Sequence, residues 1–281
     1  MKVLVTGASG LLGEDISDVF TKHHEVIALK GRNSLDIINA KAVVDYIHAQ
    51  KPDVIIHCAG WRDIDSAEKE QEKALLVNAL GTRNIALGAK AAGCRMVHIG
   101  TDSIFDGEKG APYHEFDAPC PVNVYGYSKL KAEEMVVSLL KGYYIVRIPI
   151  LFGAKGHEEN NILYNAWKKI EKGEKLYCST ERICSPTYTK DVAEVLLHMI
   201  QTDFYGIYHV ANQGAVSKYE FMKTAAEYRG FDSSNVVPCP SDSGYARRPR
   251  NTALSCLVYH ATFSFAISDW RSALKRCISE M

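Results

Sequence analysis

Residues 2–13 read KVLVTGASGLLG, a short apolar run followed at once by three glycines at every third position. The run has the length of a buried strand, and the amphipathic stretch that continues to about Phe20 has the period of a helix. Glycine at 7 and 10 allows a sharp turn and a close approach to a pyrophosphate, while Gly13 lets the helix pack tightly on a sheet. A plain tight turn would explain an isolated glycine motif, but its place between strand and helix favours dinucleotide binding.

Strands and helices alternate through the first half of the chain. We expect further strands over 24–29, 53–58, 95–100 and 143–148, separated by helices over 39–50, 66–92 and 123–140. The strands are continuous apolar runs, which is typical of a parallel sheet covered on both faces by right-handed crossovers. The predicted fold class is α/β, with a Rossmann-type doubly wound parallel sheet.

The pattern loosens after about residue 150. Turn-rich segments there separate shorter helices that we expect over 162–171, 190–201, 218–228 and 268–278. We therefore predict a dinucleotide-binding domain over residues 1–150. Residues 151–281 are predicted to form a smaller C-terminal substrate-binding lobe, interleaved with the first domain and not folding independently.

Composition argues for an enzyme of the cytoplasm. The chain has 33 lysine and arginine residues and 33 aspartate and glutamate residues, so its net charge is zero. This composition gives no excess of positive charge that would favour binding to nucleic acid or to an acidic membrane. No apolar run approaches the roughly 20 residues that span a bilayer. The eight cysteines are scattered without a Cys-x-x-Cys pair, and we interpret them as reduced packing residues.

Tyr125 and Lys129 are four residues apart in a predicted helix and therefore share one face. A free tyrosine has a pKa of about 10 and holds its proton too tightly for efficient proton transfer at neutral pH. We expect the Lys129 ammonium to lower the pKa of Tyr125 and to bind a cofactor ribose. The alternative is a half-buried tyrosine beside a lysine whose aliphatic stem covers apolar surface.

Thr101 stands where the fourth predicted strand ends, in the stretch TDSIFDG at 101–107. Ligands of open α/β sheets bind at the carboxyl ends of the strands. Thr101 could therefore hydrogen-bond a substrate carbonyl while Tyr125 delivers a proton to the same oxygen. A threonine that caps a helix or a turn is the alternative explanation.

These three features together resemble the extended short-chain dehydrogenase/reductase superfamily. Finer matches resemble the dTDP-4-dehydrorhamnose reductase family and run almost from end to end. They are KPDVIIHCA at 51–59, DSAE at 65–68, VNA at 77–79, TDSIFDG at 101–107, PVNVYG at 121–126, RPRN at 248–251, and Trp270 with Leu274.

The resemblance implies a reductase in which reduced nicotinamide gives hydride to C4 of a nucleotide-linked 4-keto sugar. It makes Tyr125 the proton donor, Lys129 its tuner and ribose anchor, and Thr101 the group that polarises the carbonyl. The implied substrate contacts are Thr101, Asp102, Ser103, Arg248 and Asn251. The implied cofactor contacts are Gly7, Ser9, Gly10, Leu11, Leu12, Gly13, Lys30, Arg32, Asp36, Ile37, Cys58, Ala59, Gly60, Tyr125 and Lys129. The partners expected are the nucleotide-sugar and, as an option, a second copy of the chain.

The end of the second strand bears on the choice of cofactor. An Asp or Glu about 20 residues after the glycines usually binds the 2′-hydroxyl of NAD, and this chain has Lys30 and Arg32 there instead. Both cations suit a 2′-phosphate. We therefore predict NADPH, with NADH as the alternative.

Two departures from the reductase family concern the sugar. Ser103 stands where the family usually has Tyr, and Pro149-Ile150 stands where it usually has Ser-Trp. The stretch RIPILFG at 147–153, together with 248–251, is similar to the regulatory β subunit of methionine adenosyltransferase. The alternative function is therefore a non-catalytic, NADP-binding regulatory subunit.

No metal is expected. Glu14 resembles one acid of a metal site that some reductases hold at a dimer interface, but Lys190 occupies the neighbourhood of a second acid. We interpret Glu14 as a first-turn helix residue and His157-Glu158-Glu159 as a solvated loop.

Overall fold

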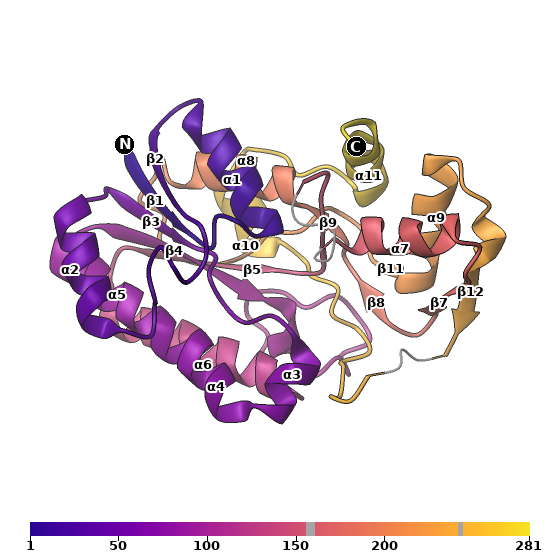
Figure 1. Ribbon diagram of the computed structural model, residues 1–281, viewed down its shortest axis with the longest axis horizontal. Coiled ribbons are helices and arrows are strands. Elements are labelled where there is room, and N and C mark those ends of the chain that lie inside the picture. Colours follow the sequence, from indigo (N-terminus) through magenta and orange to yellow (C-terminus); the bar gives the residue numbers. More distant parts are fainter. Residues whose placement is uncertain (156–160, 241–243) are drawn as a thin grey trace.

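A six-stranded parallel sheet forms the centre of the protein, in the order β10-β5-β4-β3-β1-β2 (Figure 1). The computed structural model describes residues 1–155, 161–240 and 244–281, so His157, Glu158 and Glu159 lie outside the described residues. The strand order reverses between β1 and β3, which confirms the predicted Rossmann-type sheet. The strands are β1 (Lys2–Thr6), β2 (Glu25–Leu29), β3 (Val54–His57), β4 (Arg95–Thr101), β5 (Tyr143–Ile148) and β10 (Gly206–His209).

Helices cover both faces of this sheet, as continuous apolar strands require. Alternate residues of each strand point to opposite sides. Val3 and Val5 pack toward α1 (Leu11–Thr21) and α8 (Thr189–Met199), whereas Leu4 packs toward the other face. Figure 1 shows α1 and α8 on one side of the sheet and α2, α5 and α6 on the other. The bounds of the last three are Ala40–Gln50 for α2, Gly81–Ala92 for α5 and Val124–Leu139 for α6.

The prediction of a single helix over 66–92 is wrong in one respect, because the segment is divided into several helices. Glu70 has φ −119° and ψ 58°, which is not helical and separates α3 (Ile64–Lys69) from α4 (Gln71–Leu75). A π-helical segment, η1 (Leu76–Leu80), then joins α4 to α5. Hydrophobic periodicity averages over several turns and does not detect one non-helical residue.

The sixth strand, β10, comes from the second half of the chain and was not expected from the sequence. It is only four residues long and pairs with β5 at the edge of the sheet. The helix before it, α8, packs against α1, and α10 (Leu257–Thr262) joins the same core through Tyr259. Segments from both halves of the sequence therefore build the sheet domain.

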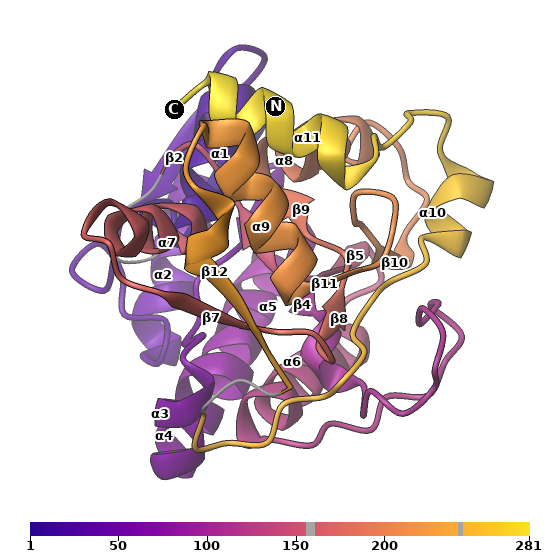
Figure 2. The same cartoon turned by 90° about the vertical axis from the view of Figure 1, so that its right-hand side faces the viewer.

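The remaining residues form a smaller lobe with its own apolar core around Trp167, Phe221 and Trp270. Figure 2 faces this lobe and shows its helices beside the β7–β12 pair. The helices are α7 (Ile162–Glu171), α9 (Lys218–Arg229) and α11 (Trp270–Ser279). The short paired strands are β6 (Leu151–Phe152) with β9 (Thr187–Tyr188), β7 (Leu176–Ser179) with β12 (Val236–Cys239), and β8 (Ile183–Cys184) with β11 (Val216–Ser217).

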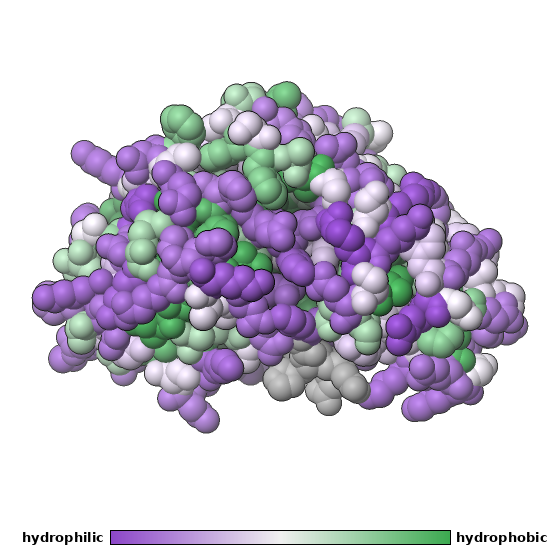
Figure 3. Space-filling view, turned by 90° about the horizontal axis from the view of Figure 1, so that it is seen from above, coloured by the Kyte–Doolittle hydropathy of each residue, from purple (hydrophilic) through white to green (hydrophobic). Residues whose placement is uncertain are grey.

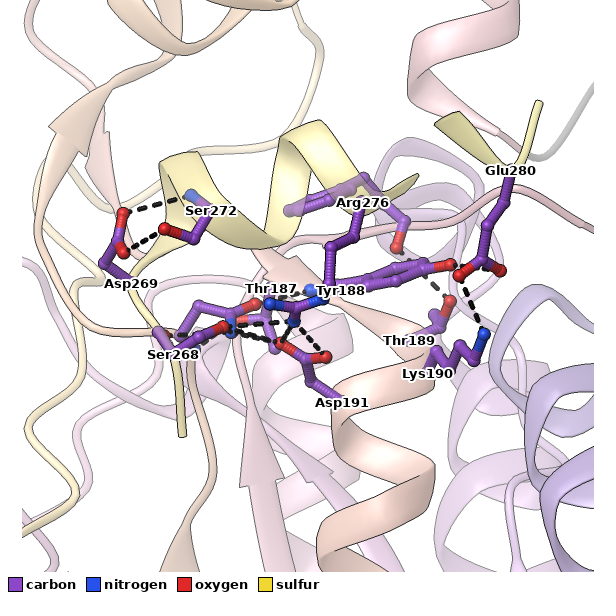
Figure 4. A network of polar contacts seen from close by, with 12 residues as sticks. Thr187, Tyr188, Thr189, Lys190, Asp191, Ser268, Asp269, Ser272, Arg276 and Glu280 are labelled. Carbon is purple, nitrogen blue, oxygen red and sulfur yellow. Dashed lines mark hydrogen bonds and ion pairs between the residues drawn. The ribbon is translucent and has the colours of Figure 1, made fainter. Parts of the chain in front are cut away.

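A polar network ties α11 to the start of α8, as Figure 4 shows. Arg276 donates to both oxygens of Asp191 at 2.5 and 2.6 Å. Lys190 donates to Glu280 at 2.7 Å, and Glu280 also accepts from the Tyr188 hydroxyl at 3.0 Å. Lys190 therefore serves in an ion pair that fixes the last helix.

The face seen from above in Figure 3 is mainly hydrophilic, with apolar residues scattered over it. Within residues 1–155, 161–240 and 244–281, no helix is both long enough and apolar enough to cross a bilayer. None of the eight cysteines, all of which are described, forms a disulfide.

Candidate active site

Two adjoining cavities, of about 450 and 590 Å³, lie at the carboxyl ends of β1, β3 and β4. This is the place where strand order reverses and where open α/β sheets bind their ligands. We call the larger one the adenosine cavity and the smaller one the catalytic cavity. The residues that line both are Gly7, Gly10, Cys58, Gly60, Trp61 and Arg62.

The glycine turn between β1 and α1 forms the floor shared by the two cavities. Gly7 has φ +68°, and a Cβ there would lie 2.7 Å from the backbone nitrogen of Ala59. A Cβ at Gly13 would lie 2.2 Å from the carbonyl oxygen of Gly7. Only glycine fits either position, and the close approach leaves the N-terminus of α1 open to an anion. The residues present therefore fit a dinucleotide.

The adenosine cavity contains most of the residues expected on that side of the cofactor. Ser9, Arg32, Asp36, Ile37 and Ala59 line it with the shared residues. The Arg32 Nε atom lies 3.7 Å from Asp36, whose Oδ1 also accepts from the backbone of Ile38. Lys30 is exposed and lines neither cavity.

The catalytic cavity brings together Thr101, Tyr125 and Lys129, with Leu11, Leu12 and Gly13. Thr101 is the last residue of β4, and its side chain is near enough to Tyr125 to act on the pKa of that hydroxyl. Asn123 caps α6 by accepting from Gly126, so Tyr125 stands in the first turn of that helix. A helix cap and a strand end thus place the two hydroxyl groups in the same cavity.

Lys129 is buried beside Tyr125 and points to the sheet. Its Nζ atom donates to the carbonyl oxygen of Ile99 at 2.6 Å and lies 3.4 Å from Nε2 of His98. Desolvation lowers the pKa of Lys129 to about 8, against the opposing effect of the Glu133 carboxylate. The lysine can therefore change its charge near neutral pH.

The sequence predicts that Lys129 lowers the pKa of Tyr125, and this prediction is wrong. Desolvation raises the pKa of Tyr125 to about 12, and the groups that act against it are Thr101 and Arg62. Lys129 instead directs its ammonium to Ile99. Tyr125 is therefore fully protonated at neutral pH, in the form that donates a proton.

Three of the expected substrate contacts, Asp102, Ser103 and Arg248, line the catalytic cavity with Thr101. Arg248 donates from Nη1 to Asp65 of α3 at 2.5 Å. The fifth, Asn251, lines neither cavity. Its Nδ2 donates to the carbonyl of Ala111 at 3.4 Å, and its Oδ1 accepts from Ala253.

Pro149 and Ile150, the departures noted in the sequence, also line the catalytic cavity. Several further lining residues were not expected from the sequence. These are Trp61, Arg62, Asn78, Arg182, Ile183 and Lys218. Trp61 and Arg62 directly follow the expected Gly60, and that adjacency is the only sequence signal for them. The second lobe supplies Arg182 and Lys218, which no local motif marks.

The described residues contain no group of three His, Cys, Asp or Glu side chains that could hold a metal. Lys190, which occupies the neighbourhood where a metal site would need a second acid, is paired with Glu280.

The chain as a whole is similar to known reductases. The family model described as "RmlD substrate binding domain" matches residues 1–281. A dTDP-4-dehydrorhamnose reductase of Burkholderia thailandensis is 30% identical over 100% of this chain and 99% of its own. The crystal structure of dTDP-4-dehydrorhamnose reductase from Bacillus anthracis in complex with NADP has a TM-score of 0.94 and 32% identity, covering 100% of this chain and 99% of its own. The methionine adenosyltransferase 2 subunit beta of Danio rerio is 33% identical over 91% of this chain and 83% of its own.

Proposed function

The chain belongs to the RmlD substrate binding domain family, and we propose that it reduces the 4-keto group of a nucleotide-linked deoxy sugar with NAD(P)H. The protein is an NAD(P)H-dependent oxidoreductase of the short-chain dehydrogenase/reductase type. The observation that carries the proposal is the meeting of Thr101, Tyr125 and Lys129 in a cavity that opens onto the glycine turn.

NAD(P)H, held at the glycine turn of Gly7 and Gly13, would supply the hydride that the carbonyl carbon of the sugar receives. The chain supplies the proton, from Tyr125, to the carbonyl oxygen. The Thr101 hydroxyl lines the same cavity as Tyr125 and would share that oxygen and stabilise its developing charge. Lys129 lines the same cavity and would bind the ribose of the cofactor.

NADPH is the cofactor that the adenosine cavity fits best. Gly7 and Gly13 allow the pyrophosphate to approach the N-terminus of α1, and Asp36 with Ile37 forms the wall for the adenine. The Arg32 guanidinium lines the same cavity and would meet a 2′-phosphate. NADH remains usable because the other cofactor contacts do not involve that phosphate.

The sugar would lie between the two lobes, and we propose that the smaller lobe of residues 151–281, which is interleaved with the sheet domain through α8, β10 and α10, binds the substrate. Asp102, Ser103 and Arg248 would contact the nucleotide-sugar. Ser103 and Ile150 leave room where aromatic side chains would stack on a sugar, so they would set which sugar is accepted.

The first experiment follows NADPH absorbance with enzymatically generated dTDP-4-dehydrorhamnose. Wild-type protein is run beside Tyr125→Phe and the matched control Tyr127→Phe, whose ring is 46% exposed on the same helix. We expect the first substitution to lower kcat roughly 100- to 10,000-fold and the second to leave it within about twofold. Equal rates for wild type and Tyr125→Phe would contradict the proposed proton donor.

A second function is favoured by one observation, the apolar pair Pro149-Ile150 in the catalytic cavity of a chain similar to a methionine adenosyltransferase β subunit. In that case the protein would bind NADPH, oxidise none of it with any nucleotide-sugar, and co-purify with a synthetase subunit. The same absorbance experiment, with a co-purification assay, separates the two functions.

We also propose a cytoplasmic location, a homodimer and a reaction that needs no metal. The eight cysteines without a disulfide support the first of these. Cell fractionation tests the location, and sedimentation tests the homodimer. Activity after chelator treatment tests whether the reaction needs a metal. Loss of activity in chelator that returned with Mg²⁺ would contradict the third.

A further inference from the structure

His98 is a polar residue in the middle of a buried, mainly apolar strand. β4 reads RMVHIGT, and His98 at its centre is 0% exposed. Successive residues of a strand point to opposite faces of the sheet. Met96 packs in the core on the side of α5 and α6, so His98, two residues further along, also points toward α6. A polar side chain buried at such a place costs free energy unless it has a partner there.

The partner of His98 is the ammonium group of Lys129. The Nζ atom lies 3.4 Å from Nε2 of His98 and donates to the carbonyl oxygen of Ile99 at 2.6 Å. An ammonium group has three N–H donors and no acceptor. Two of these donors are directed at β4, and the third can reach a hydroxyl group of a cofactor ribose. The strand therefore holds Lys129 from the side of the sheet.

This contact decides which ring nitrogen of His98 carries the proton. Because a charged Lys129 only donates, Nε2 must accept with its lone pair, and the proton of the neutral ring is on Nδ1. Within the described part of the chain, the buried Nδ1 atom has no hydrogen-bond partner. The fold thus leaves one nitrogen of the ring unpaired, at a cost in free energy, and directs the other at Lys129.

A second buried imidazole packs against the first. The ring centroids of His57 and His98 are 5.7 Å apart, and the planes are inclined by 30°. Thr82 gives its own proton to a backbone carbonyl, so its oxygen accepts from Nε2 of His57 at 3.1 Å. Thr6 then donates to Nδ1 of His57 at 2.7 Å. Both nitrogens of His57 are engaged in this way, and His98 is the ring that serves Lys129.

Burial keeps the two imidazoles and the nearby thiol of Cys58 neutral. It lowers the imidazole pKa values, to about 3 in His57, and raises the thiol pKa to about 12. The carboxylate of Glu133, one turn after Lys129, is bound by Arg147 at 2.8 to 3.2 Å. The imidazole of β4 is therefore the side-chain acceptor that meets Nζ itself. The titratable and charged groups around Lys129, from β3, β4, β5 and its own helix, are His57, Cys58, His98, Arg147, Tyr125 and Glu133.

We propose that His98 is a positioning residue for Lys129: its neutral ring, protonated on Nδ1, accepts from the ammonium group and holds it charged on the sheet side of the catalytic cavity. The kinetic consequences of this inference rest on the proposed function. The position of the ring proton and its link to Lys129 depend only on the contact and not on turnover.

Nitrogen-15 NMR of the imidazoles in the full chain tests the contact without any substrate. We expect His98 to give the signals of a neutral ring with its proton on Nδ1, assigned by their loss in His98→Gln. Its Nε2 signal should move with a midpoint near pH 8, because Lys129 loses its proton there, and should not move in Lys129→Met. A ring proton on Nε2, or a signal that stays constant between pH 6 and 10, would overturn the proposal.

The pair His98→Met and His98→Gln tests the kinetic consequence. The two side chains have the same length, but only the amide offers a strong acceptor. Without the acceptor the ammonium is less favoured, so the alkaline limb of kcat/KM should move down by about 0.5 to 1 pH unit in His98→Met. In His98→Gln the limb should stay within about 0.3 pH unit of wild type. A merely structural role would lower the rate equally at every pH and leave the limb in place.

His57→Gln is the control for damage to the packed pair of rings. It changes the ring beside His98 and leaves both contacts of Nζ in place, so the alkaline limb should not move. A limb that stays in place in His98→Met, or that moves equally in His57→Gln, would overturn the proposal.

Failure of the proposed function gives a different result. A wild-type protein that oxidises no NADPH with any nucleotide-sugar would overturn the reductase, and the NMR titration would still decide whether His98 accepts from Lys129. The same titration decides the question if His98→Met does not fold, because it does not use that variant.

Discussion

The Nζ atom of Lys129 lies 2.6 Å from the carbonyl oxygen of Ile99, so the lysine of α6 is tied to β4 two residues before Thr101. This bond fixes the cation at the sheet side of the catalytic cavity, which Thr101 and Tyr125 also line. Burial lowers the pKa of Lys129 to about 8 and raises that of Tyr125 to about 12. The pKa values of Lys129 and Tyr125, which would be similar in an exposed pair, are therefore far apart.

We predict that the alkaline limb of the kcat/KM profile lies near pH 8 and belongs to Lys129. Reduction requires a protonated Tyr125, which persists to far higher pH, and a charged Lys129, which does not. The rate should fall about tenfold per pH unit above the limb. Lys129→Arg should be slower at every pH but show no limb between pH 7 and 10, because arginine does not deprotonate there. A limb near pH 8 that persists in this variant would assign it to another group.

Lys129→Met should be inactive yet more stable than wild type at pH 7. The folded-state pKa of about 8 lies below the unfolded value of 10.5. Below pH 8 Lys129 is protonated in both the folded and the unfolded chain, so the folded chain carries the whole cost of burying its charge. The substitution should therefore raise the free energy of unfolding by on the order of 3 kcal/mol, less the contribution of the lost hydrogen bond to Ile99. Between pH 8 and 10.5 the folded lysine loses its proton first, so wild-type stability rises with pH.

Urea unfolding of both proteins at several pH values measures this difference, and the other titrating groups cancel in the comparison. The stability advantage of Lys129→Met should shrink steadily from pH 8 upward. A constant difference between pH 7 and 10 would show that Lys129 is not charged at a cost in the folded protein.

Arg32→Ala should weaken NADPH binding roughly tenfold and leave NADH within about twofold. Arg32 lines the adenosine cavity, whereas Lys30 is exposed outside it. A guanidinium contact to a phosphate is a charge-assisted hydrogen bond, moderated here by the solvent around an exposed side chain. Lys30→Ala is the comparison and should have the smaller effect. Dissociation constants by fluorescence decide it, and an equal loss of both cofactors would indicate general damage to the cavity.

The parts of the site that the sequence predicts are those built from local pattern. The glycine turn needs only Gly7 and Gly13 in register with one strand and one helix, and Tyr125 with Lys129 needs only a helical period. Burial is different, because it depends on what the rest of the chain places around a group. The sequence alone therefore predicts a lowered pKa for Tyr125, although desolvation raises the pKa of this residue.

The second lobe contributes residues that no local motif marks. Arg182 and Lys218 reach the catalytic cavity only because that lobe packs over the ends of the strands. Asn251 shows the converse, since it belongs to a matching motif but bonds to Ala111 outside the cavity. The short strand β10 was missed for the same reason, because it depends on pairing with β5. The break at Glu70 is a single non-helical residue, which hydrophobic periodicity does not detect.

Asp65 holds Arg248 at the edge of the catalytic cavity. Asp65 accepts from Nη1 of Arg248 at 2.5 Å and from the backbone nitrogen of Ala246 at 2.8 Å. These bonds hold the pKa of Asp65 well below its usual range. The carboxylate is therefore charged at every pH at which activity is measured, and the segment around Arg248 is tethered to α3.

Asp65→Ala should raise the KM for the nucleotide-sugar by roughly three- to tenfold, with kcat within about twofold, because it releases Arg248 without touching Tyr125. Arg247→Ala is the matched control, since Arg247 pairs with Glu108 at the surface and lines neither cavity. Binding of NADPH should be unchanged in both, because Arg248 does not line the adenosine cavity. Initial rates over a range of sugar concentrations measure the effect. Equal KM values in the two variants would show that Asp65 has no part in placing Arg248.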